Sequence, residues 1–183
     1  MMSDLDRLQE VFTIFLDGLW WGLRDNVGAL SMYEGYSNGF RLIGMQAAQD
    51  QEVKGTEEAA ALAANIMKAI GLNLEVEGSE IRVDSCPIWD RIKEQGLEYS
   101  FHVEEICWKP LLEAIAEEAG VKAFVDSSLR QIHVKRGKIE YKRSKLQRKL
   151  QEGSIAQKEH DEALAQLDKQ LYSIPEKGRY RFA

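Results

Sequence analysis

Apolar residues recur at steps of three and four along most of the first seventy positions. Residues 4–27, 30–48 and 56–70 each follow this period, which predicts three amphipathic helices. The middle stretch also contains Gly35, Gly39 and Gly44. Glycine weakens a helix by up to about 1 kcal/mol relative to alanine, so we expect another backbone or a ligand to come close to this helix.

Apolar and polar residues alternate in the next part of the chain, which predicts β-strands. Residues 72–78 and 79–85 alternate on either side of Gly78-Ser79 and predict a first hairpin. A second hairpin is predicted from residues 121–127 or, where the pattern is stronger, from residues 129–136 and 138–143 joined by Gly137.

Two further helices are expected between the hairpins. One covers residues 87–95 and begins at Pro87, and the other covers residues 100–119, with Pro110 marking a kink or a restart. The predicted fold class is therefore α+β, with helices packed on an antiparallel sheet made of two separate hairpins. Residues 1–143 would form this domain.

The last forty residues have a different pattern. Residues 144–171 predict a pair of short helices interrupted at Gly153, and residues 173–183 are expected to be loop. Neither short helix would be stable alone, so each must pack on the domain or on another chain. Residues 144–183 are thus predicted to be a helical C-terminal appendage.

Composition narrows the class of protein. The 183 residues are 44% hydrophobic and 30% charged, with two cysteines. No apolar run reaches the roughly 18–20 residues of a membrane helix, and the polar N-terminus is unlike a secretory signal. Two cysteines fit a reducing compartment, so we expect a cytoplasmic protein without a membrane span.

Charge is unevenly distributed along the chain. The net charge is −6, but residues 130–150 contain nine Lys or Arg and one acid. Such a segment can contact nucleic acid, or it can neutralise its own acidic body or a partner subunit. Nucleic acid is not the expected partner, because the acidic remainder of the chain would repel phosphates.

The candidate metal ligands follow the first hairpin. Two thiols, one imidazole and one carboxylate could hold zinc, and they are supplied by Cys86, His102, Glu104 and Cys107, with Glu105 nearby. Glu104 and Cys107 are three apart and share a helix face, whereas His102 and Cys107 point about 140° apart. A site of Cys86, Glu104 and Cys107 is therefore easier to build than one that includes His102.

Cys86 also has two simpler interpretations. Next to Pro87, at the start of a helix, its thiol pKa would be lowered and it could act as a catalytic nucleophile with His102 or His133 as base. Alternatively both cysteines are small buried core residues. Whether the protein is an enzyme stays open.

Aromatic residues suggest a ligand pocket beside the helix glycines. The candidate wall is formed by Tyr33, Tyr36, Phe40, Trp89 and Trp108. Ordinary core packing is the alternative for each of them.

Several segments together give the chain a likeness to known families. They are MYEGYSNGFRLIGMQAA, GLNLEVEGSEIRVDSCP, the helix after HVEEICWKP, and QIHVKRGKIEYKR. Over residues 28–143 this order resembles the 4-vinyl reductase domain family, which shares its fold with TRAPP-type trafficking subunits. The run CPIWDRIKEQGLEYSFHVEEICW is also similar to L-2-amino-thiazoline-4-carboxylate hydrolase-like proteins. KLQRKLQEGSIAQKEHDEALAQL resembles short C-terminal modules associated with oligomerisation or docking.

The resemblance implies a homodimer with an internal pocket for a small hydrophobic or aromatic molecule, acting as a sensor or accessory protein. Some relatives bind zinc through cysteines and an acid, but here the predicted last hairpin lacks a cysteine. Two other functions remain as alternatives: a small thiol- or metal-dependent hydrolase using Cys86, and an assembly protein acting through the C-terminal helical pair.

Overall fold

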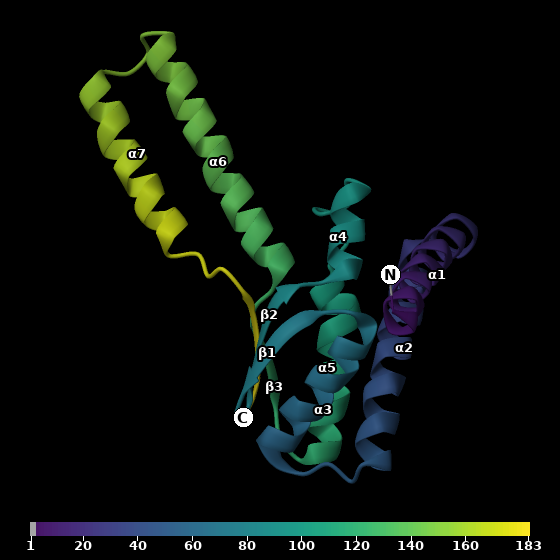
Figure 1. The fold of residues 1–183 in the computed structure, drawn as a ribbon. Coiled ribbons are helices and arrows are strands. Elements are labelled where there is room, and N and C mark those ends of the chain that lie inside the picture. Colours follow the sequence, from purple (N-terminus) through teal and green to yellow (C-terminus); the bar gives the residue numbers. More distant parts are fainter. Residues whose placement is uncertain (1–2) are drawn as a thin grey trace.

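The computed structural model describes residues 3–183 (Figure 1). The α-helices are α1 (Asp4–Val27), α2 (Ala29–Asp50), α3 (Gly55–Ile70), α4 (Pro87–Glu94), α5 (Lys109–Ala119), α6 (Leu129–Gln151) and α7 (Gln157–Tyr172). A π-helical turn, η1 (Glu104–Trp108), precedes α5. The strands are β1 (Asn73–Glu77), β2 (Glu80–Ser85), β3 (Ala123–Ser127) and β4 (Gly178–Phe182). The α+β class predicted from the sequence is confirmed.

The four strands form one antiparallel sheet in the order β1-β2-β4-β3. β4 comes from the C-terminus yet lies inside the sheet, where Tyr180 is opposite both Ile81 and Val125. Tyr180 and Phe182 are buried, whereas Arg179 and Arg181 are not. This alternation places the apolar side of β4 against the helices.

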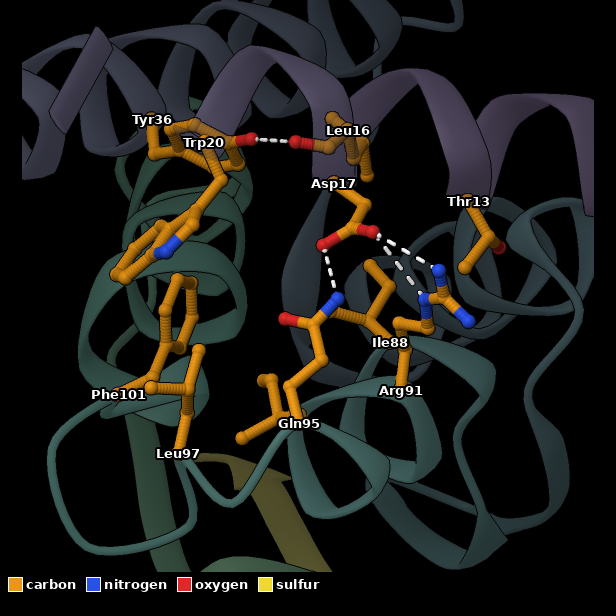
Figure 2. A pocket seen from close by; sticks show the side chains of 11 residues that line it. Thr13, Leu16, Asp17, Trp20, Tyr36, Ile88, Arg91, Gln95, Leu97 and Phe101 are labelled. Atoms are coloured by element: carbon orange, nitrogen blue, oxygen red, sulfur yellow. Dashed lines mark hydrogen bonds and ion pairs between the residues drawn. The ribbon is translucent and has the colours of Figure 1, made fainter. Parts of the chain in front are cut away.

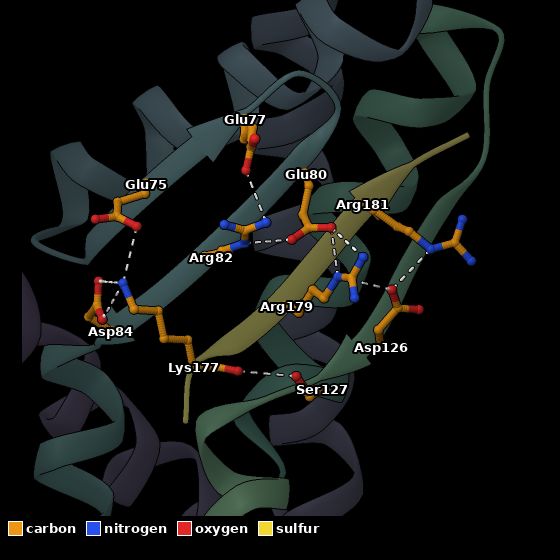
Figure 3. A network of polar contacts seen from close by, with 10 residues as sticks. All are labelled: Glu75, Glu77, Glu80, Arg82, Asp84, Asp126, Ser127, Lys177, Arg179 and Arg181. Atoms are coloured by element: carbon orange, nitrogen blue, oxygen red, sulfur yellow. Dashed lines mark hydrogen bonds and ion pairs between the residues drawn. The ribbon is translucent and has the colours of Figure 1, made fainter. Parts of the chain in front are cut away.

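The opposite face of the sheet is covered by ion pairs (Figure 3). Arg179 binds Glu80 at 2.5 Å, and Arg181 binds Asp126 at 3.0 Å. Lys177 contacts carboxylates of both β1 and β2. Charged pairs of this kind keep the face solvated and contribute little to stability, about 0–1 kcal/mol each.

The helices build outward from the sheet in successive layers. α3 and α5 contact the strands, α2 packs along α5, and α1 packs on α2 (Figure 1). α2 lies close to α5 at Gly44, where an added Cβ would lie 2.5 Å from the carbonyl oxygen of Leu111. This glycine therefore has the close backbone neighbour that the sequence pattern required.

The predicted hairpin of residues 129–136 and 138–143 is wrong, because these residues form the first two-thirds of α6. Ser128 caps this helix by accepting a hydrogen bond from the Gln131 amide at 3.1 Å. Gly137 is tolerated in the helix, and an added Cβ there would lie 3.2 Å from the Tyr99 hydroxyl. The competing prediction of a strand at residues 121–127 is confirmed as β3.

The C-terminal appendage predicted for residues 144–183 ends in a strand rather than in a loop. Residues 173–183 were expected to be loop, but they contain β4. The expected boundary between residues 143 and 144 falls inside the continuous helix α6. The helical pair itself is present: α6 and α7 pack on each other and project from the body as an arm (Figure 1). Gly153, with φ of 69°, lies in the turn between them.

Pro110 marks a restart rather than a kink. It lies in the first turn of α5, directly after η1. A π-helical turn is rare and shifts the side chains before and after it onto a different face. Four of its five residues are buried, so the π-turn directs Glu104 and Cys107 toward the sheet side of the core.

Candidate functional site

Cys86 connects the end of β2 to the start of α4. Its Sγ accepts a hydrogen bond from the Trp89 amide at 3.4 Å, and Pro87 occupies the first helical position, as the sequence predicted. The side chain is buried. Burial raises the pKa of the Cys86 thiol to about 12, although the amides of Trp89 and Ile88 act in the opposite direction.

Cys107 and Glu104 lie close to Cys86, as the sequence analysis proposed. Burial raises the pKa of the Cys107 thiol well above its usual value, and the nearby charges of Cys86 and Glu104 raise it further. Burial is also the main cause of the raised pKa of Tyr180, and the nearby Cys86, Glu104 and Cys107 raise it further. The hairpin, the π-turn and the C-terminal strand therefore meet at one buried point.

His102 does not join this group, since its side chain is exposed just before the π-turn. Within residues 3–183, no three His, Cys, Asp or Glu side chains are arranged to hold a metal ion. The raised pKa values of both thiols keep them protonated near neutral pH, which disfavours a cysteine nucleophile there. The remaining base candidate, His133, packs edge-on against Trp89 with ring centroids 5.6 Å apart.

Arg130 completes the buried cluster and was missed by the sequence analysis. Its Nη1 binds Oε1 of Glu104 at 3.2 Å, and its Nε and Nη2 donate to the carbonyl oxygens of Glu98 and Tyr99. Oε2 of Glu104 has no hydrogen-bond partner among the described residues. One guanidinium thus ties the loop before the π-turn to the first turn of α6. The missed helix start explains the omission, because Arg130 was assigned to a strand.

The five aromatic residues predicted to line a pocket do not form one wall. Tyr33 and Tyr36 surround Trp20 and Phe101, with centroid distances of 5.8 to 6.5 Å. Phe40 packs edge-on against Trp108 at 5.4 Å, in the core between α2 and α5. Trp89 lies apart from the other four, beside α6.

A small, partly open cavity lies where α1 faces α4 (Figure 2). Its apolar side is formed by Trp20, Tyr36 and Phe101. At its mouth Asp17 accepts hydrogen bonds from Gln95 at 2.6 Å and from Arg91 at 3.1 Å. The space is about 30 Å³, which is the volume of one water molecule.

A larger space lies on the other side of Tyr36, in a groove between α1 and α2. The groove has a volume of about 210 Å³ and is lined by Phe12, Leu16, Leu19, Leu23, Gly35, Tyr36, Gly39, Phe40 and Ile43. The one polar group, the Tyr36 hydroxyl, donates a hydrogen bond to the Leu16 carbonyl. An added Cβ on Gly39 would meet nothing within 4 Å. Two of the predicted ligand residues, Tyr36 and Phe40, therefore line this groove.

Helices α1 and α2 expose many large apolar side chains, of which Leu19 and Ile43 line the groove. The large apolar side chains of α1 and α2 that are exposed are Leu5, Leu8, Val11, Ile14, Phe15, Leu19, Val27, Leu30, Leu42 and Ile43. Exposed apolar patches of this extent mark interaction sites in most proteins. The sequence signal for those on α1 was the recurrence of apolar residues along the first predicted helix.

No helix in residues 3–183 is long and apolar enough to span a membrane. Comparisons with models of known protein families, with curated proteins and with solved structures found no match.

Proposed function

We propose that this protein binds a small apolar or aromatic molecule in the groove between α1 and α2, and acts as a cytoplasmic sensor or accessory protein. The observation that carries the proposal is the groove of about 210 Å³, which is lined by apolar side chains and two glycines, whereas the larger surface clefts are bordered by charged side chains. Ligand sites are concave and mostly apolar, and this groove has both properties.

The lining defines the chemistry of the ligand. Among residues 3–183, no charged side chain borders the groove, and the hydroxyl of Tyr36 already donates to the Leu16 carbonyl. A ligand with a charge or with several polar groups would lose hydration there without gaining a partner. Gly35 and Gly39 leave the α2 backbone bare, so a flat ring can lie directly on it. The ligand class is thus an uncharged hydrocarbon or aromatic compound.

A second copy of the chain would cover the groove. Leu19 and Ile43 are exposed and line the groove, and Leu8 and Phe15 lie on the same side of α1, so a symmetric dimer through this face would bury them together with the ligand. Phe15 is 61% exposed on α1 and represents this surface. Binding and dimerisation would then support each other, because each buries apolar surface that the other leaves in water.

The thiol-enzyme alternative is less well supported. A nucleophilic cysteine needs an exposed thiolate, whereas Cys86 is buried and its thiol pKa is raised to about 12. The assembly alternative assumed that the C-terminal helices need another surface to pack on. Because α6 and α7 pack on each other, they do not require a partner chain for this.

Native mass spectrometry tests the proposal on gently purified protein. The expected species is a dimer that carries a small molecule, and Phe15→Glu should convert it into a folded monomer that has lost the adduct. Tyr172→Glu is the matched control, because Tyr172 is 90% exposed on α7, away from the groove. A wild-type monomer without an adduct would contradict the proposal.

A further inference from the structure

Five lysines form a stripe along the projecting arm. Lys135, Lys138, Lys142, Lys145 and Lys149 follow one another at steps of three and four residues on α6. At 100° per residue they fall within an arc of about 80°, and at 1.5 Å per residue they extend over about 21 Å. They will be called the lysine stripe.

The lysine stripe has no partner within residues 3–183. All five side chains are exposed, and none forms an ion pair or a hydrogen bond with the described residues. Arg143, on the same helix, contrasts with them, because it binds Asp168 of α7 at 3.2 Å and Glu140 at 3.3 Å. Acids within the arm thus neutralise Arg143 and leave the lysine stripe free.

The position of the stripe on α6 keeps it accessible. The side of α6 that meets α7 carries Arg143, and the half-buried Leu146 and Leu150 lie on that same side. The lysine stripe lies about a quarter turn away, beside this seam rather than in it. Packing of α7 on α6 therefore leaves the stripe facing solvent.

Repulsion between its like charges makes the lysine stripe unfavourable for the stability of α6. Lys138 and Lys142, like Lys145 and Lys149, are four residues apart, and like charges at this spacing repel each other on a helix. Bound anions would remove the repulsion along the whole stripe. A polyanion suits it better than single ions, because successive lysines are only about 5 Å apart along the axis.

The acidic part of the protein lies elsewhere. Its acids are dense at the α2–α3 connection and at the end of α5, where the exposed carboxylates are Asp50, Glu52, Glu57, Glu58, Glu117 and Glu118. This end of the body is opposite the tip of the arm (Figure 1). Charges are screened over about 8 Å at physiological salt, so the net charge of −6 does not prevent an anion from binding to the arm.

We propose that the lysine stripe binds the phosphodiester backbone of nucleic acid, without reading its sequence. The regular, extended line of ammonium groups matches a linear array of phosphates. A membrane surface fits less well, because α7 covers the apolar side of α6 that would otherwise insert into lipid. This interaction surface is separate from the α1–α2 groove.

Fluorescence anisotropy with a labelled 25-base-pair DNA duplex tests the proposal. Wild-type protein should bind with a logarithmic salt slope of about −4.5, from five phosphate contacts at about 0.9 each. In the triple variant K142A/K145A/K149A the slope should fall to about −2, and the affinity at low salt by tenfold or more. Alanine favours the helix, so this variant should keep the fold.

The matched control is K54A/K68A/K122A, which removes the same charge from exposed lysines of the body. It should bind like the wild type. Equal loss in both triple variants would overturn the proposal, as would absence of duplex binding at 50 mM salt. Salt-sensitive binding to anionic phospholipid vesicles without binding to DNA would also overturn it and would assign the stripe to membranes.

Discussion

Glu104 and Arg130 form an ion pair with an N–O distance of 3.2 Å in which both side chains are largely buried. The side-chain exposures are 2% for Glu104 and 11% for Arg130. The pair joins the π-turn to the first turn of α6, residues that lie 26 apart in the sequence. It therefore attaches the arm to the body at the buried cysteine cluster.

Loss of Arg130 should be strongly destabilising. Arg130→Met leaves the Glu104 carboxylate buried without its partner, and we expect a loss of about 3–5 kcal/mol in unfolding free energy. Arg143→Met removes two partly exposed ion pairs, with Glu140 and Asp168, and should cost about 1 kcal/mol or less. Urea denaturation measures both changes. Adding Glu104→Gln to Arg130→Met should restore part of the loss, and a double variant no more stable than the single one would argue against this cause.

Two helix glycines should respond to alanine in opposite directions. An added Cβ on Gly44 would lie 2.5 Å from the Leu111 carbonyl oxygen, so Gly44→Ala should cost about 1–3 kcal/mol by forcing α2 from α5. Gly39→Ala meets no atom within 4 Å and should gain up to about 1 kcal/mol from helix propensity. Thermal unfolding of the two variants compares them directly. Similar shifts in both would show that α2 and α5 are not closely packed at Gly44.

The strand β4 should be essential for the stability of the fold although it lies at the C-terminus of the chain. Phe182 is 1% exposed on β4, and Phe182→Ala should lower the unfolding free energy by about 3–5 kcal/mol. Tyr172→Ala, just before the strand, removes a ring that is 90% exposed and should change stability by less than about 0.5 kcal/mol. If Phe182→Ala were as stable as Tyr172→Ala, β4 would not be part of the sheet in solution.

Stability should fall at alkaline pH. The folded pKa of Cys86 is about 12, above the usual 9.0, and those of Cys107 and Tyr180 are also raised by burial. The unfolded chain therefore releases these protons first as pH rises above about 9. Each thiol then costs about 1.4 kcal/mol of stability per pH unit, up to its folded pKa.

Urea midpoints at pH 7, 9 and 10.5 measure this dependence. The decline should be smaller in Cys86→Ala, which lacks one of the titrating groups, once its lower stability at pH 7 is subtracted. A wild-type midpoint that stays constant up to pH 10.5 would show that the thiols are not buried as described.

The sequence predicted those elements whose own pattern was strong. The first three helices, the β1–β2 hairpin and the helical pair were predicted because their periods are clear, and Cys86 at the start of α4 followed from Pro87. α6 was missed because IHV and KIEY around Gly137 alternate like strands, and its cap at Ser128 went unrecognised. β4 was missed because a five-residue strand with two arginines is stabilised by its neighbours, although GRYRF does alternate.

The candidate site was only partly predictable for a related reason. Helix spacing predicted that Glu104 and Cys107 share one face. Arg130 contacts Glu104 through the tertiary packing of α6, a helix that the sequence pattern did not predict. Likewise, aromatic content pointed to Tyr36 and Phe40, whereas the groove depends on how α1 lies across α2. Sequence periodicity identifies the apolar faces of helices but does not say which of them stay uncovered.

The central claim is that the α1–α2 groove binds an uncharged aromatic molecule, and a titration with 1-aminoanthracene tests it most directly. Fluorescence of this probe should rise on binding to wild-type protein with a saturable, one-site curve per chain. Gly39→Leu fills the groove and should abolish that site, whereas Gly18→Leu, on an exposed part of α1 outside the groove, should leave it unchanged. Saturable binding that is equal in all three proteins, or absent from the wild type, would contradict the claim.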